Sequence, residues 1–98
     1  MMGIEPSETI LVGRWILGGG RPLEDEMSTR IRMLIKSHLI ELGRDTSGWN
    51  ILYRDPDDKR YWELTYPESG LHGGGQPQLK CLTADEANEK YAAHLKNT

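Results

Sequence analysis

The sequence has little cysteine and no long hydrophobic run. One cysteine, Cys81, stands among 98 residues, which excludes an intramolecular disulfide and suits a reducing compartment. No apolar stretch approaches the roughly 18 residues that a membrane-spanning helix needs. The first residues, MMGIEPSE, have neither the basic start nor the apolar core of a signal peptide. We therefore expect a cytoplasmic protein that does not enter a membrane.

Charge and size limit the function further. The formal net charge is −3 and the pI is near 5.6, which disfavours nucleic acid as the main partner. Charged residues make up 28% of the chain and hydrophobic residues 37%, a balance typical of a folded protein rather than a disordered one. The length predicts a single domain, residues 1–98, with one modest core.

Residues 48–77 carry the strongest pattern, which predicts a β-hairpin followed by a glycine loop. The segments 49–55 and 61–67 are rich in Trp, Tyr, Ile, Leu and Thr, side chains that suit a half-buried strand. Between them, Asp-Pro-Asp-Asp-Lys-Arg has the residues of a tight turn.

The predicted register gives the hairpin two different faces. A loop over 56–59 pairs Arg54 with Tyr61 and Tyr53 with Trp62, and side chains alternate between faces along each strand. We expect Trp62 to be buried and Tyr61 to be exposed. The apolar face would hold Trp49, Ile51, Tyr53, Trp62, Leu64 and Tyr66, and the mostly polar face Asn50, Leu52, Arg54, Tyr61, Glu63 and Thr65.

Two further strands and two helices are predicted around this hairpin. Residues 8–17 read as a strand in which Gly13 marks a bulge or a close backbone approach, and 78–82 as a short edge strand. Residues 23–42 and 84–96 read as helices. The expected architecture is α+β, with a small antiparallel sheet and both helices on one face.

Each predicted helix has recognisable end signals. Acidic residues in the first turn of 23–42 suit the helix dipole, and Gly43 suits the position after its end. Thr83 and Glu86 have the spacing of a capping box. The buried stripe of the first helix would hold Met27, Ile31, Leu34, Ile35, His38 and Leu42.

Known catalytic and metal-binding patterns are missing. His72 opens an HGGG string similar to the oxyanion loop of lipases, but the chain has no G-x-S-x-G nucleophile motif. The histidines and Cys81 never come in the close pairs of zinc sites. Asp55, Asp57 and Asp58 resemble the start of a calcium loop that lacks its later glycine and glutamate. We expect no metal and no cofactor.

Two functions other than protein binding stay open from the residues alone. Glu63 and His72 are of the types that form the acid–base pair of a small hydrolase. Arg54, Arg60 and Tyr61 are of the types that contact single-stranded RNA, although the acidic turn beside them would repel phosphates.

The hairpin region resembles the Immunity protein 27 family of bacterial polymorphic toxin systems. The strings that carry the resemblance are SGW, LYRDP, RYWELTYP and HGGG, with LVGRWIL before them and Glu86, Ala87, Lys90 and Tyr91 after them. Nearly the whole chain is covered. The resemblance implies a cytoplasmic protein without enzymatic activity that binds a cognate secreted toxin and blocks it.

A toxin partner also suggests where contact would occur. Toxins of such systems are often nucleases with basic surfaces, which a mildly acidic inhibitor suits. Asp57 and Asp58 lie at the predicted hairpin tip. We expect the partner surface to include Arg54, Asp57, Asp58, Arg60, Tyr61, Glu63 and His72. Whether Arg54, Asp55, Arg60 and His72 serve binding or the fold stays open, as does the oligomeric state.

Overall fold

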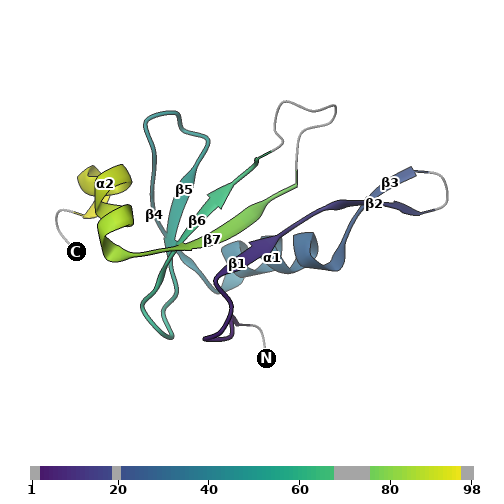
Figure 1. Cartoon of the computed structure of the whole chain (residues 1–98), viewed down its shortest axis with the longest axis horizontal. Coiled ribbons are helices and arrows are strands. Elements are labelled where there is room, and N and C mark those ends of the chain that lie inside the picture. The colour runs from purple at the N-terminus through teal and green to yellow at the C-terminus, as the bar shows by residue number, and fades with distance from the viewer. Residues whose placement is uncertain (1–2, 19–20, 68–75, 96–98) are drawn as a thin grey trace.

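The computed structural model describes residues 3–18, 21–67 and 76–95 (Figure 1). Among these residues, five strands form one antiparallel sheet in the order β1-β7-β6-β5-β4, and β2 pairs with β3 in a second, two-stranded sheet. The α+β class is confirmed. No helix in these ranges is long and apolar enough to cross a bilayer. The elements are β1 (Ile10–Val12), β2 (Trp15–Gly18), β3 (Arg21–Glu24), α1 (Glu26–Ser37), β4 (Ile40–Arg44), β5 (Ile51–Arg54), β6 (Tyr61–Thr65), β7 (Gln78–Leu82) and α2 (Ala84–Leu95).

The β5–β6 hairpin has the predicted register. Arg54 pairs with Tyr61 and Tyr53 with Trp62. The turn between them closes on Asp55, whose N–H donates to the Arg60 carbonyl at 2.9 Å. The alternation of side chains was therefore sufficient to fix the pairing, although β5 has four residues and β6 five where seven were predicted for each.

The predicted strand over 8–17 is divided into β1 and β2, and Gly13 lies at the division. Its N–H donates to the Pro77 carbonyl at 2.9 Å. A Cβ at this position would lie 2.3 Å from Ser28 Oγ and 2.8 Å from Pro77 O. The expected close backbone approach is confirmed, because α1 and the chain before β7 both press against this glycine.

The predicted helix over 23–42 is wrong at both ends, because residues 23–24 lie in β3 and residues 40–42 in β4. Gly43, predicted to follow the helix, also lies in β4. The helix is α1, which begins after Asp25, the N-cap whose side chain accepts from Ser28 N, and ends at Ser37. The chain then forms β4, which pairs with β5 and carries a bulge between Glu41 and Gly43. Pairing with β5 decides the structure here, since the contacts of a neighbouring strand override local helical spacing.

The predicted place of β7 in the sheet is wrong, whereas the predicted bounds of β7 and the predicted cap of α2 are confirmed. Strand β7 has the predicted bounds but lies between β1 and β6, so it is not an edge strand. Helix α2 begins at the predicted residue 84, and position 96 of the predicted helix lies outside the described residues. Its capping box is present, because Thr83 N–H donates to Glu86 Oε1 at 2.9 Å and Glu86 N–H to Thr83 Oγ1 at 3.1 Å.

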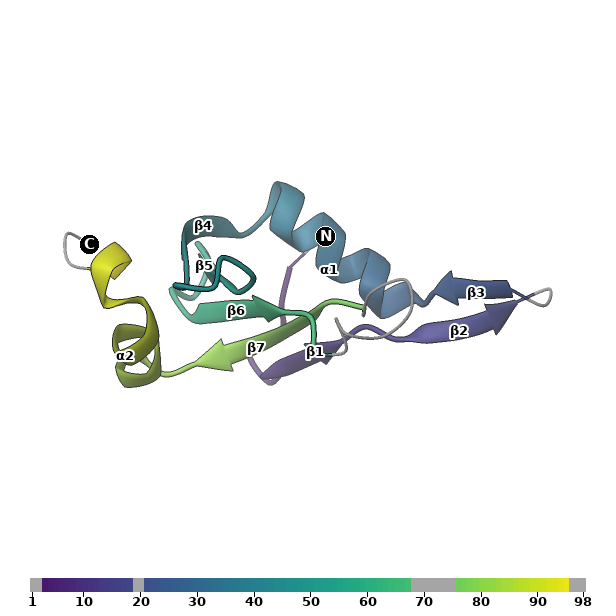
Figure 2. The ribbon, with the colours of Figure 1, turned by 90° about the horizontal axis from the view of Figure 1, so that it is seen from above.

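The two helices pack on opposite faces of the sheet, which corrects the prediction that they share one. Figure 2 shows α1 above the strands and α2 at the end of the molecule opposite β2 and β3. Neighbouring residues of β5 show this, because Ile51 packs into the cluster with α1 and Leu52 into the cluster with α2. The α1 cluster comprises Leu11, Ile31, Leu34, Leu39, Ile51, Tyr53, Trp62, Leu64 and Leu79. The α2 cluster comprises Leu52, Leu82, Ala87, Tyr91 and Leu95. The face expected to be polar is therefore partly a second core.

Burial of the hairpin side chains follows from these two clusters. Trp62 is fully buried, as predicted. Tyr61 is half-buried against the α2 cluster rather than exposed. Trp49 is 73% exposed, although it was assigned to the apolar face, because β5 begins only at Ile51.

The two tryptophans of the hairpin region provide a matched test of this burial. Trp62→Ala should lower the free energy of unfolding by about 3–5 kcal/mol, the usual loss for a large core aromatic. Trp49→Ala should change it by less than about 0.5 kcal/mol, as is usual for exposed positions. Urea unfolding of both variants checks this, and similar losses in the two would contradict the assignment of faces.

Gly13 supplies a second test. Gly13→Ala should destabilise the fold by about 1–3 kcal/mol, because inserting a methyl group into a filled space forces its neighbours apart. Gly3→Ala is the control, since a Cβ there meets no atom within 4 Å. Chemical denaturation should separate the two variants, and a stable Gly13→Ala protein would show that β1 does not approach α1 this closely.

Candidate functional site

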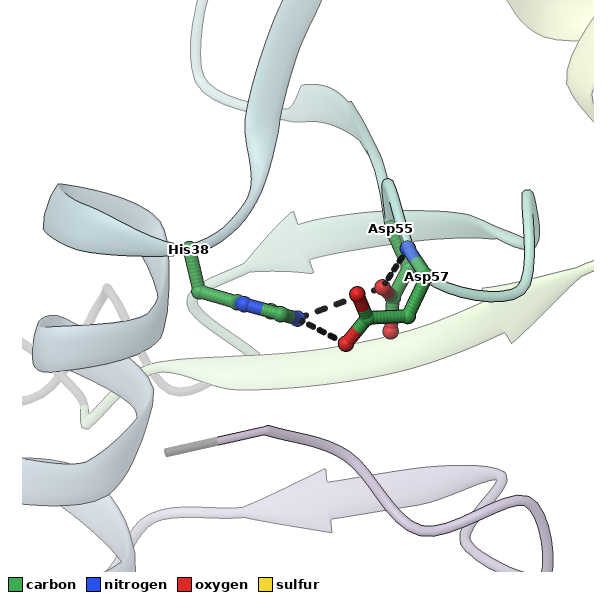
Figure 3. Close-up of side chains that lie close together, drawn as sticks. All are labelled: His38, Asp55 and Asp57. Carbon is green, nitrogen blue, oxygen red and sulfur yellow. Dashed lines mark hydrogen bonds and ion pairs between the residues drawn. The ribbon is translucent and has the colours of Figure 1, made fainter. Parts of the chain in front are cut away.

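The hairpin turn and the end of α1 bring one histidine and two carboxylates together (Figure 3). His38 is the C-cap of α1, and its Nε2 lies 3.2 Å from Asp55 Oδ1 and 3.5 Å from Asp57 Oδ2. Asp55 Oδ1 also accepts the Asp57 N–H at 2.8 Å. The cluster therefore joins a helix end to the turn of the central hairpin.

Burial within this cluster is uneven. The Asp55 side chain is 1% exposed and that of His38 14%, whereas that of Asp57 is 74% exposed. Asp55 Oδ2 is buried and has no hydrogen-bond partner among the described residues. A buried carboxylate oxygen without a donor is energetically costly. The side chains of His38, Asp55 and Asp57 each offer a ligand atom within 4.8 Å of the others, so this is the described group that could hold a cation.

Arg60, an expected partner-binding residue, makes several contacts within the chain. Its Nε lies 2.6 Å from Asp58 Oδ2, and its Nη atoms donate to the carbonyls of Glu8 and Glu5 at 2.6 and 3.1 Å. The guanidinium carbon is 4.9 Å from the centre of the Trp62 ring. Arg60 thus fastens the N-terminal segment to the hairpin.

The Asp58 carboxylate is held by this arrangement. Burial alone would raise its pKa, but hydrogen bonds from the Arg60 backbone and side chain outweigh that effect and lower the pKa of Asp58 below its ordinary value. Asp58 and Asp57 therefore differ. Asp58 is paired with an arginine, while Asp57 extends into solvent beside His38.

Glu63 is buried against α2 and is not on an open polar face. It is 7% exposed, and its Oε2 accepts from Tyr91 Oη at 2.7 Å and lies 2.7 Å from Lys90 Nζ. Burial, with the adjoining Glu63 carboxylate, raises the pKa of the Tyr91 hydroxyl. A groove of about 410 Å³ lies beside these side chains, and its lining residues are Glu63, Lys80, Leu82, Glu86, Glu89 and Lys90.

Three expected site residues remain, which are Arg54, Tyr61 and His72. Arg54 is half-buried, and its buried Nε has no hydrogen-bond partner among the described residues. Tyr61 packs partly against α2. His72 lies outside the described residues, so the suggested pair of Glu63 and His72 finds no test here.

The cluster of His38 with Asp55 was missed by the sequence reasoning. The two residues are 17 positions apart, and no metal motif has this spacing. His38 was assigned to the buried stripe of a longer helix, and Asp55 to a solvated turn. Recognising that the helix ends at residue 37 would have placed His38 at a helix end, where its side chain is free to meet the hairpin.

Comparison with known proteins gives a family match. Residues 18–83 match the family model described as Immunity protein 27. The matched range runs through β7 and includes His38, Asp55 and Asp57, whereas α2 lies beyond it. No curated protein and no solved structure shows significant similarity to the chain.

The ion pair between Arg30 and Glu8 predicts that the stability of the fold depends on pH. Both Nη atoms of Arg30 donate to the Glu8 carboxylate at 2.7 Å, which lowers the pKa of Glu8 from 4.5 to about 2. A lowered folded-state pKa adds stability that is present above the unfolded value and is lost as the pH falls. The free energy of unfolding should therefore decrease between about pH 4.5 and about pH 2.

Glu8→Gln isolates this contribution. The variant should be about 1–2 kcal/mol less stable than the wild type at neutral pH, allowing for partial exposure of the pair. It should also lose stability less steeply with acid, and Arg30→Gln should behave in the same way. Urea unfolding at several pH values measures both effects. Parallel curves for the wild type and both variants would show that this ion pair does not hold the segment.

Proposed function

Because the chain belongs to the Immunity protein 27 family, we propose that it binds a cognate bacterial toxin in the cytoplasm and blocks it by covering the toxin's working surface. The observation that carries this proposal is the family match over residues 18–83. An immunity function follows from the family. Occlusion as the mechanism, and a toxin with a basic surface such as a nuclease, are our inferences.

The side-chain contacts favour binding over catalysis. The most plausible general acid or base of the hairpin, Glu63, is engaged by Tyr91 and Lys90. Tyr61, which an RNA-binding surface would present for stacking, is partly covered by the α2 cluster. Both features support a protein that acts by contact, without turnover of a substrate.

We place the centre of the contact surface at the hairpin tip. Asp57 presents its carboxylate to solvent there, and the turn is fixed by hydrogen bonds from Asp55 N–H to Arg60 O and from Lys59 N–H to Asp55 O, each 2.9 Å long. A rigid surface loses less conformational entropy on binding than a flexible one. An exposed carboxylate suits a basic partner.

The other proposed contact residues take different roles around this centre. Asp58 contributes charge near the tip, and Arg60 keeps the turn attached to the N-terminal segment. Arg54 and Tyr61, at the adjoining strand ends, would form the rim. Glu63 stays in the proposed set as a lining residue of the groove beside α2, and His72 stays in it on the sequence alone, because it lies outside the described residues.

Protection of cells tests the function directly. The toxin candidate is the product of the gene next to the one that encodes this chain. Expressing its toxin domain alone should stop growth, and co-expression of this chain should restore growth and give a complex that elutes as one peak in gel filtration. Growth arrest that this chain does not relieve, with no complex formed, would contradict the proposal for that partner.

A contact surface at the hairpin tip predicts that the carboxylates there increase the rate of association with the toxin. Replacing Asp57 and Asp58 by Asn should slow association with the toxin at low salt by up to about tenfold, the lower range of electrostatic steering. The melting temperature should change little, because a surface ion pair such as Asp58–Arg60 contributes little stability. Stopped-flow mixing at two ionic strengths measures the effect.

A matched variant controls for net charge. Glu86→Gln with Glu89→Gln removes two carboxylates from the groove beside α2 and should leave association nearly unchanged. If this control slows association and the tip variant does not, the contact surface lies on the α2 side of the sheet.

A further inference from the structure

Two distances between ligand atoms in the His38 cluster match those around a metal ion. Tetrahedral zinc sites have bonds of about 2.0–2.2 Å to nitrogen and oxygen, which places neighbouring ligand atoms roughly 3.3–3.6 Å apart. In the structure, His38 Nε2 is 3.2 Å from Asp55 Oδ1 and 3.5 Å from Asp57 Oδ2. Imidazole and carboxylate are also ligand types that zinc accepts.

The charges of the cluster call for a cation. Asp55 is fully buried, and Oδ1 accepts the Asp57 N–H while Oδ2 has no partner among the described residues. A buried carboxylate is tolerated when it is paired or coordinates a metal. His38 lies at the C-terminus of α1, where the helix dipole also favours positive charge. A divalent ion would balance both carboxylates and leave the imidazole neutral.

The supporting backbone is fixed, and one side of the cluster is open. The His38 N–H donates to the Leu34 carbonyl at 2.9 Å, and the Asp55 N–H to the Arg60 carbonyl, also at 2.9 Å. Two of the ligands are therefore held by regular structure. The Asp57 side chain is 74% exposed, which gives an ion a path from solvent and leaves water room to complete the coordination.

From these observations we propose that His38, Asp55 and Asp57 bind one divalent zinc-type cation, with water in the remaining position. The proposal concerns the isolated chain and does not depend on the toxin. The ion would tie the end of α1 to the hairpin tip and make the tip more rigid.

Metal titration of the purified, metal-free chain tests the site. Zn²⁺ added in a calorimeter should bind with a stoichiometry of one, and Co²⁺ should give the visible absorption of a four-coordinate ion. Asp57→Asn and His38→Gln should each weaken Zn²⁺ binding by at least about 10–100-fold, the range seen even for loss of outer-shell partners in metal sites. Asp58→Asn, which alters a neighbouring carboxylate paired with Arg60, should bind Zn²⁺ like the wild type.

Two results would overturn the proposal. One is a wild-type chain that binds no Zn²⁺ at submillimolar concentrations. The other is binding of equal strength in the wild type, Asp57→Asn and His38→Gln, which would place the ion on other residues such as Cys81. Circular dichroism verifies that each variant is folded, and because Asp57 is exposed, its variant keeps the test valid if His38→Gln does not fold. Since no toxin is present, failure here leaves the proposed immunity function untouched.

Discussion

Burial of the β5–β6 hairpin on both of its faces is the constraint on which the rest of the structure depends. Trp62 and its neighbours on one face need α1 and β1, while Leu52 on the other face needs α2. The turn is held separately, by His38 on one side and by Arg60 on the other. A hairpin held in this way leaves the Asp57 carboxylate at its tip open to solvent.

The parts of this fold that could be predicted from sequence are those set by local pattern. The hairpin register follows from side chains that alternate every two residues, and the place of Gly13 from a glycine inside an apolar strand. Strand β4 could not be predicted, because Leu42 continues the spacing of α1 and only pairing with β5 makes the segment extended. Burial of Glu63 was hidden for a related reason, since its partners Tyr91 and Lys90 lie on a helix far along the chain.

In the candidate site, too, a feature set by local sequence could be predicted, whereas contacts between distant segments could not. Asp57 was placed at the hairpin tip from turn chemistry alone, and the structure has it there. Its contact with His38, and the burial of Asp55 beneath it, depend on where α1 ends. The groove beside α2, lined by glutamates and lysines, is a second charged surface, but part of its lining lies beyond the residues that match the family. The tip lies wholly within them, which favours it as the surface for a family-wide function.

The most direct test of this account is hydrogen–deuterium exchange of the chain alone and in complex with its toxin. Binding at the hairpin tip predicts that the backbone amides of residues 55 and 57–60 exchange more slowly in the complex, with little change over α2. Slower exchange confined to α2 and the strand ends beside it, with the tip unaffected, would contradict the proposed contact surface.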